Sequence, residues 1–191
     1  MTSFSIIGTG NMATAIGSVL TGGGSDVSFI SRDEVGAAPL ADVVILATPY
    51  PAVASIVEAY GAQLDGKTVV DISNPLNFET FDSLVVPVGS SAAAELQSQL
   101  PNSRVLKAFN TNFAATLATK KVGDVDTTVL VAGDSSEAKA ELIAAVEAGG
   151  VGAIDAGALT RAHELEALGF LQLTLAVGEK LPWTAGVAVV R

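Results

Sequence analysis

The stretch FSIIGTGNMATAIG, residues 4–17, decides the fold because an apolar run leads through a glycine-rich turn into small residues at helical spacing. The segment GTGNMA at residues 8–13 has the pattern G-x-G-x-x-A between a strand and a helix. In this pattern Gly8 makes the tight turn, Gly10 lets the backbone approach a pyrophosphate, and Ala13 lets the helix pack closely on the strand. The free N–H groups of the helix then face the phosphates. The stretch therefore predicts a dinucleotide-binding site.

Outward from this stretch, apolar runs alternate with helical patterns, which indicates an α/β protein with a parallel sheet and right-handed crossovers. Further strands are expected at residues 26–31, 41–49, 67–73, 104–110, 127–133 and 151–157, and helices at 11–24, 50–64, 90–100, 134–150 and 161–178. Between the second and third strands, RDEVGAAPL is too short for a normal crossover helix, so one turn or bare loop is expected.

These elements predict an NAD(P)-binding Rossmann fold with a doubly wound, mostly parallel sheet. Residues 1–157 are expected to form the nucleotide-binding domain. Residues 158–191 are expected to form a small C-terminal lobe, a helix and a short strand GVAVV at 186–190, packed on that domain as one structural unit.

Composition excludes several classes of function. The chain carries a formal net charge of −10, which argues against duplex DNA or an anionic membrane as a partner. It has no cysteine and a single histidine, His163, so we expect no disulfide, no thiolate chemistry and no metal site. No apolar run approaches the roughly 20 residues of a membrane helix, and the first residues lack the basic segment of a signal peptide, so none is expected. A cytoplasmic protein is the expectation.

The end of the second strand indicates which dinucleotide binds. Ser31 and Arg32 stand about 20 residues after the glycine turn, where a Rossmann fold reads the adenosine ribose. A hydroxyl and a guanidinium suit a 2′-phosphate, which favours NADP. Asp33 keeps NAD open as an alternative.

Two families resemble the chain. IGTGNMATAI resembles the opening of pyrroline-5-carboxylate reductases, but those proteins need a long helical dimerisation domain after the nucleotide domain, and 191 residues are expected to be too few for it. The ordered set GTGNMA, SR, VVDISNPL, SSAAAELQSQLP, VLKAFNT, VAGD and DAGAL resembles the NADPH-dependent coenzyme F-420 reductase family. The nucleotide domain of the six-transmembrane ferric reductases is similar to that family. The resemblance implies a homodimer that passes hydride between NADP(H) and the deazaflavin coenzyme F-420.

The resemblance also implies roles for individual residues. The NADP phosphates and the adenosine ribose would be held by Thr9, Asn11, Met12, Ser31 and Arg32. The adenosine side would be flanked by Thr48 and Pro49, and the nicotinamide by Asn74, Pro75, Leu76 and Ala108. Asn110 and Asn112 depart from the pattern, since archaeal members carry His and an apolar residue there. The acceptor therefore stays open between a deazaflavin and a flavin.

Hydride transfer between two ring cofactors needs positioning more than acid–base side chains. Candidate acceptor residues are Asn110 and Thr111 at a strand end and His163 at the start of the last helix. Reduction of a small imine or carbonyl compound is an alternative, but it would need a proton donor. Lys107 is the candidate amine, and the apolar residues around it predict a buried strand rather than a catalytic position. An NADP-binding sensor without turnover is a further alternative.

Two other residues receive structural interpretations. Asp71 is expected to organise the loop that follows its strand by accepting hydrogen bonds. Trp183 is expected to pack against the C-terminal lobe or a dimer partner, because aromatic residues are enriched at interfaces.

Overall fold

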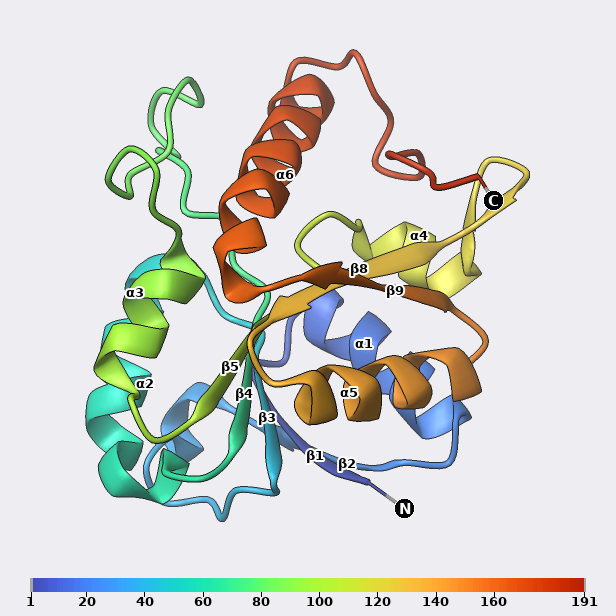
Figure 1. Cartoon of the computed structure of the whole chain (residues 1–191). Helices are drawn as coiled ribbons and strands as arrows, with labels where there is room; N and C mark the ends of the chain where they lie inside the picture. The colour runs from blue at the N-terminus through green and yellow to red at the C-terminus, as the bar shows by residue number, and fades with distance from the viewer. Residues whose placement is uncertain (1, 191) are drawn as a thin grey trace.

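The computed structural model describes residues 2–190 and contains a seven-stranded sheet with helices on both faces (Figure 1). The strand order is β2-β1-β3-β4-β5-β8-β9. The strands are β1 (Ser3–Ile7), β2 (Asp26–Ile30), β3 (Val43–Leu46), β4 (Thr68–Asp71), β5 (Arg104–Lys107), β8 (Thr128–Gly133) and β9 (Gly152–Gly157). Strands β1 to β5 pair in parallel, β8 pairs with β5 in the antiparallel sense, and β9 is parallel to β8. The expectation of a mostly parallel sheet is confirmed.

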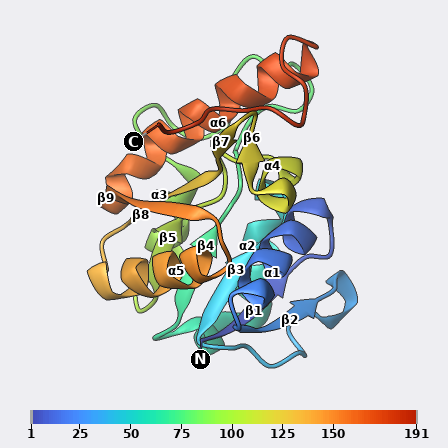
Figure 2. The ribbon, with the colours of Figure 1, turned by 90° about the vertical axis from the view of Figure 1, so that its right-hand side faces the viewer.

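The helices form two layers, as Figures 1 and 2 show. They are α1 (Asn11–Gly22), α2 (Tyr50–Tyr60), α3 (Ala92–Gln99), α4 (Ala114–Thr119), α5 (Ser136–Ala148) and α6 (Ala162–Val177). One apolar cluster joins the sheet to α1, α4 and α5, and a second joins it to α2, α3 and the start of α6. Strand β3 explains why both layers form: Val43 and Ile45 belong to the first cluster, whereas Val44 and Leu46 belong to the second.

The order of the strands places a switch point between β1 and β3. From β1 the chain moves to β2 on one side, and from β3 it moves to β4 and β5 on the other. The β2–β3 connection contains a single 3-10 turn, η1 (Arg32–Glu34), as the short sequence between these strands predicts. Ligands of open α/β sheets bind at such a point, beyond the carboxyl ends of the strands. The glycine turn and the segment that follows β3 meet there.

A buried charge cluster joins α6 to the sheet. The Lys107 ammonium lies 2.8 Å from Asp71 on β4 and 2.9 Å from Glu166 on α6, and it donates to the Ser73 carbonyl at 2.5 Å. The Glu166 carboxylate also accepts the N–H groups of Ala92 and Ala93 at the start of α3, at 2.9 and 3.3 Å. Lys107 is therefore committed to structural ion pairs, and Glu166 links three elements of the fold.

The region after α6 differs from the expectation. The predicted strand GVAVV is wrong, because residues 184–190 form an irregular segment with no strand neighbour in the described chain. Its Val187 N–H donates at 2.8 Å to the side chain of Gln172 on α6. Apolar alternation alone does not make a strand where the main chain does not pair with a neighbouring strand.

One segment of regular structure was not anticipated. Residues 114–126 form α4 and a short hairpin of β6 (Lys121–Val122) and β7 (Val125–Asp126). The remaining turns are η2 (Gly61–Leu64) and η3 (Leu159–Arg161). Across residues 2–190, no helix combines the length and the apolar character needed to cross a membrane.

Candidate functional site

Three adjoining cavities follow the carboxyl edge of the sheet. The β2-side cavity, about 680 Å³, is lined by Gly8, Thr9, Gly10, Ile30, Arg32, Val35, Ala47, Thr48, Pro49 and neighbours. The central cavity, about 390 Å³, is lined by Gly10, Asn11, Met12, Ala13, Thr48, Pro49, Tyr50, Ile72, Ser73, Asn74, Phe78 and Leu173, among others. The α4-side cavity, about 390 Å³, is lined by Asn11, Met12, Ile72, Asn74, Phe109, Asn110, Asn112, Phe113, Leu173 and Trp183, among others. Shared walls make one cleft of the three.

The glycine turn shapes the first half of this cleft. Gly8 has φ +128°, and a Cβ there would lie 2.3 Å from the Ala47 carbonyl oxygen, so β1 and β3 approach closely only with glycine. A Cβ at Gly10 would meet nothing within 4 Å, because that position faces the open cleft. Gly10 is also the N-cap of α1, with no side-chain cap and no acidic residue in the first turn. The positive end of α1 is therefore free to receive an anion.

The end of β2 carries the polar groups expected for an adenosine ribose. Ser31 donates to one oxygen of Glu34, Oε2, from its backbone N–H at 2.9 Å and from its hydroxyl at 2.5 Å. These bonds lower the pKa of the exposed Glu34 carboxyl from its usual value. Arg32 lines the β2-side cavity and forms no ion pair within residues 2–190.

The central cavity contains unpartnered hydroxyls and a tyrosine. The oxygens of Thr48 and Ser73 are buried without a hydrogen-bond partner among the described residues. Asp71 accepts the Ser73 N–H at 2.9 Å and so organises the loop, as expected. The Tyr50 hydroxyl donates to Glu95, and burial together with this carboxylate raises the pKa of Tyr50 to about 12. Tyr50 therefore holds its proton firmly and is a poor acid at neutral pH.

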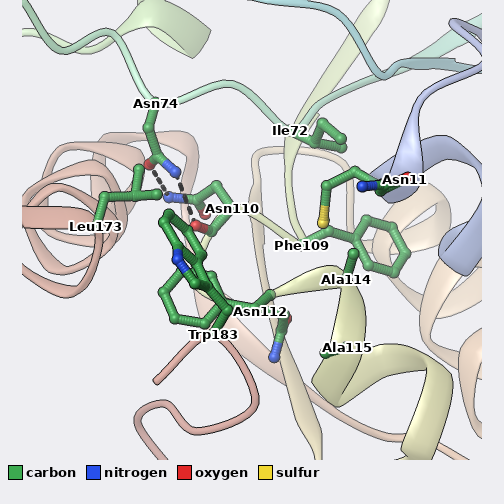
Figure 3. A pocket seen from close by; sticks show the side chains of 12 residues that line it. Asn11, Ile72, Asn74, Phe109, Asn110, Asn112, Ala114, Ala115, Leu173 and Trp183 are labelled. Atoms are coloured by element: carbon green, nitrogen blue, oxygen red, sulfur yellow. Dashed lines mark hydrogen bonds between the residues drawn. The ribbon is translucent and has the colours of Figure 1, made fainter. Parts of the chain in front are cut away.

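Asparagine side chains supply the polar part of the α4-side cavity (Figure 3). Asn74 donates to the Asn110 carbonyl at 2.8 Å, and the Asn110 amide donates to the Asn74 side chain at 2.9 Å and to Leu165 on α6 at 2.8 Å. The Asn112 amide donates to Thr128 at 3.1 Å. The side-chain oxygens of Asn110 and Asn112 have no hydrogen-bond partner in the described chain, although both are buried. Such oxygens are suited to accept N–H groups of a ligand.

Aromatic side chains close this cavity. Phe109 adopts φ +63°, a left-handed conformation that is costly for a bulky residue and that turns the chain at the end of β5. Trp183 of the C-terminal segment packs on Phe113 with ring centroids 5.0 Å apart. Trp183 therefore packs on the nucleotide-binding part of the chain, whereas packing on the C-terminal lobe or a partner was expected, and it forms part of the cavity wall.

The cleft brings together many of the residues singled out in the sequence. Its walls include Gly8, Thr9, Gly10, Asn11, Met12, Ala13, Arg32, Thr48, Pro49, Asn74 and Asn110. Ser31 stands beside it, bonded to Glu34.

Among the described residues, six candidates do not line these cavities: Ser31, Pro75, Leu76, Ala108, Thr111 and His163. Leu76 and Ala108 are packed in the core, and the His163 Nδ1 lies 3.0 Å from the Ser90 carbonyl. Phe109, Phe113, Leu173 and Trp183 line the cleft without having been identified as site residues. The sequence offers no local signal for them, because apolar residues of loops and helices reach the cleft only through the tertiary fold.

Comparisons with known proteins agree with this geometry. No model of a protein family matches the chain. It is 34% identical over 149 residues to the F420-dependent NADP reductase of Methanocaldococcus jannaschii, a match covering 76% of this chain and 66% of that enzyme. It is 29% identical over 182 residues to the metalloreductase STEAP3 of Rattus norvegicus, covering 85% of this chain and 35% of that protein. The chain thus spans about two thirds of one relative and about a third of the other.

A solved structure supports the same fold. A protein from Arthrobacter sp. FB24, provisionally named an F420-dependent NADP reductase, superposes with a TM-score of 0.85 over 100% of both chains at 24% identity. At that identity the likeness establishes the Rossmann architecture. Together with the relationship in sequence, it shows that the chain belongs to the F420-dependent NADP reductase family of NADP-dependent oxidoreductases.

Proposed function

We propose that the chain binds NADP(H) along the β2-side and central cavities and passes hydride to or from a deazaflavin or flavin in the α4-side cavity. The observation that carries this proposal is the continuity of the cleft. The central and the α4-side cavities adjoin, because five residues line both of them: Asn11, Met12, Ile72, Asn74 and Leu173. A ring system in one cavity could therefore contact a ring system in the other. The names of the relatives support NADP and coenzyme F-420 as the pair of ligands.

The residues present fit a dinucleotide. Gly8 keeps the turn tight, Gly10 leaves open space, and the uncapped start of α1 offers N–H groups to a pyrophosphate. The unpartnered hydroxyls of Thr48 and Ser73 would accept or donate hydrogen bonds further along the bound molecule. When bound, the nicotinamide supplies the hydride.

The chain itself contributes positioning and exclusion of water. Met12, Ile72 and Leu173 are apolar walls where the two cavities join, and Trp183 covers the outer side. The orphan oxygens of Asn110 and Asn112 would orient the polar edge of the acceptor. The proton that a ring nitrogen of the acceptor gains together with the hydride can come from water, so no side chain needs to transfer it. Reduction of an imine or carbonyl is less well supported, because Tyr50, a hydroxyl facing the central cavity, retains its proton.

The test is an acceptor screen with NADPH and NADH as donors, followed at the absorbance of reduced nicotinamide. Oxidation of NADPH only in the presence of coenzyme F-420, FMN or FAD would support the proposal. Turnover of small imines or carbonyls without these acceptors would refute it. Tight NADPH binding with no reaction across the panel would instead favour a sensor.

We also propose a homodimer that covers part of α6. Leu171 and Leu175 are 56% and 40% exposed and lie one helical turn apart on α6. Two neighbouring exposed leucines form an apolar patch, and such a patch often marks an interface between subunits. Light scattering coupled to size exclusion should give twice the mass of one chain. Leu171→Glu should then reduce the mass to that of a monomer, and a monomeric parent protein would refute the proposal.

A further inference from the structure

Ser31 directs both of its hydrogen-bond donors at a single anionic atom. Its backbone N–H lies 2.9 Å and its hydroxyl 2.5 Å from Glu34 Oε2. The backbone contact is one half of the capping box of η1, and the hydroxyl contact adds to it. The carboxylate occupies the place at the end of β2 where two donors converge. A negatively charged oxygen is thus already bound by the chain at this position.

This position is the one that a Rossmann fold uses to read the 2′ substituent of the adenosine ribose. It adjoins the glycine turn, since the Gly8 N–H donates to the Ile30 carbonyl at 2.9 Å. The next residue, Arg32, lines the β2-side cavity, and its guanidinium is not engaged by Asp33, Glu34 or any other acidic group that the structure describes. The Arg32 guanidinium is therefore free to bind a phosphate, whereas both donors of Ser31 are already bonded to Glu34.

We propose that Glu34 is a resident competitor of the 2′-phosphate: its carboxylate holds the Ser31 donors and must swing out before a phosphorylated ribose can use them. The proposal rests on the proposed NADP site. Two anions cannot share these donors, because a carboxylate and a phosphate within hydrogen-bonding distance of one another repel.

Displacement of Glu34 is feasible without a change of fold. The side chain is exposed, so water can replace Ser31 as its partner, and its backbone is held independently by the turn. Glu34 is charged at neutral pH, and its bonds to Ser31 lower its pKa further. Glu34 thereby acts as a specificity-determining residue that weakens the preference for phosphorylated over unphosphorylated nucleotides.

Isothermal titration calorimetry with 2′,5′-ADP and 5′-AMP tests the proposal, since only the first carries the 2′-phosphate. Glu34→Gln removes the charge while an amide oxygen can still complete the capping box. Asp33→Asn is the matched control, because it removes the same charge from the same turn at a residue not bonded to Ser31. For an exposed interaction of this kind we expect Glu34→Gln to lower the Kd of 2′,5′-ADP about three- to fivefold. The Kd of 5′-AMP should stay unchanged, and Asp33→Asn should change either value less than twofold.

Equal gains in the two variants would overturn the proposal, because the effect would then be general charge. Weaker binding of 2′,5′-ADP by Glu34→Gln would overturn it too, by showing that Glu34 positions Ser31 for the ligand. Glu34→Ala, which removes both carboxylate oxygens, must show at least the gain of Glu34→Gln. A parent protein that binds neither nucleotide would refute the NADP site itself. Binding of both nucleotides with no selective gain would refute only the role of Glu34.

Discussion

Removal of the Glu166 carboxylate is expected to destabilise the protein strongly. Glu166 is completely buried and accepts from the Lys107 ammonium and from the N–H groups of Ala92 and Ala93. Breaking a buried ion pair by removing one partner costs about 3–5 kcal/mol. In Glu166→Ala the Lys107 ammonium keeps Asp71 as a partner, so we expect a cost near the lower end of this range. The two N–H groups lose their acceptor, at about 1–3 kcal/mol each where water cannot reach them. Water that enters the vacated space would solvate the Lys107 ammonium and the two N–H groups in part, so we expect a total loss of about 4 kcal/mol, somewhat below the sum of the separate costs.

Thermal and urea denaturation would measure this loss. For a chain of this size, about 4 kcal/mol corresponds to a fall in Tm of about 8–16 °C. Glu164→Ala on the same helix is the control, because Glu164 pairs with Arg161 on the surface and should contribute less than about 1 kcal/mol. A loss below about 1 kcal/mol for Glu166→Ala, or equal losses in the two variants, would refute the view that the buried cluster holds α6 to the sheet.

Three further predictions concern the nucleotide turn, the ribose and pH. Gly8→Ala should lower Tm, because its Cβ would lie 2.3 Å from the Ala47 carbonyl oxygen. Gly10→Ala has open space around its Cβ, so it should leave Tm unchanged and weaken only NADPH binding. Equal Tm values for the two variants would contradict this reasoning. Arg32→Ala should weaken NADPH by about 1.5–3 kcal/mol and leave NADH unchanged in fluorescence titrations, and equal effects on both would exclude a 2′-phosphate contact. Burial raises the pKa of Glu166 above its model-peptide value of 4.5, so the folded state binds this proton more tightly. The free energy of unfolding should therefore rise as the pH falls through the native pKa towards 4.5, and urea denaturation should show a smaller rise in Glu166→Gln.

The sequence predicted those parts of the fold that depend on local patterns. The strand–turn–helix unit requires a residue without a side chain at Gly8, and the pattern G-x-G-x-x-A shows this requirement directly in the sequence. The continuous apolar run of β3 correctly indicated a strand buried on both faces. The length of the segment after Ser31 correctly excluded a crossover helix.

Other features depend on tertiary placement and left no local signal. Apolar periodicity indicates a strand but not its direction, so the antiparallel pairing of β8 with β5 was not predictable from the run itself. Lys107 could be placed in a buried strand, but its partner Glu166 lies 59 residues further along the chain. Likewise, Trp183 reaches the cleft only because the segment after α6 folds back towards α4.

The position of β2 at the edge of the sheet has a consequence for the behaviour of the protein in concentrated solution. Strand β2 lies at one end of the sheet, with Asp26 and Ser28 exposed and Phe29 45% exposed. An outermost strand presents main-chain donors and acceptors to which a foreign strand can add. The charge of Asp26 and the shortness of the strand oppose such addition. Replacement of Asp26 by an apolar residue would therefore favour self-association through this edge over time.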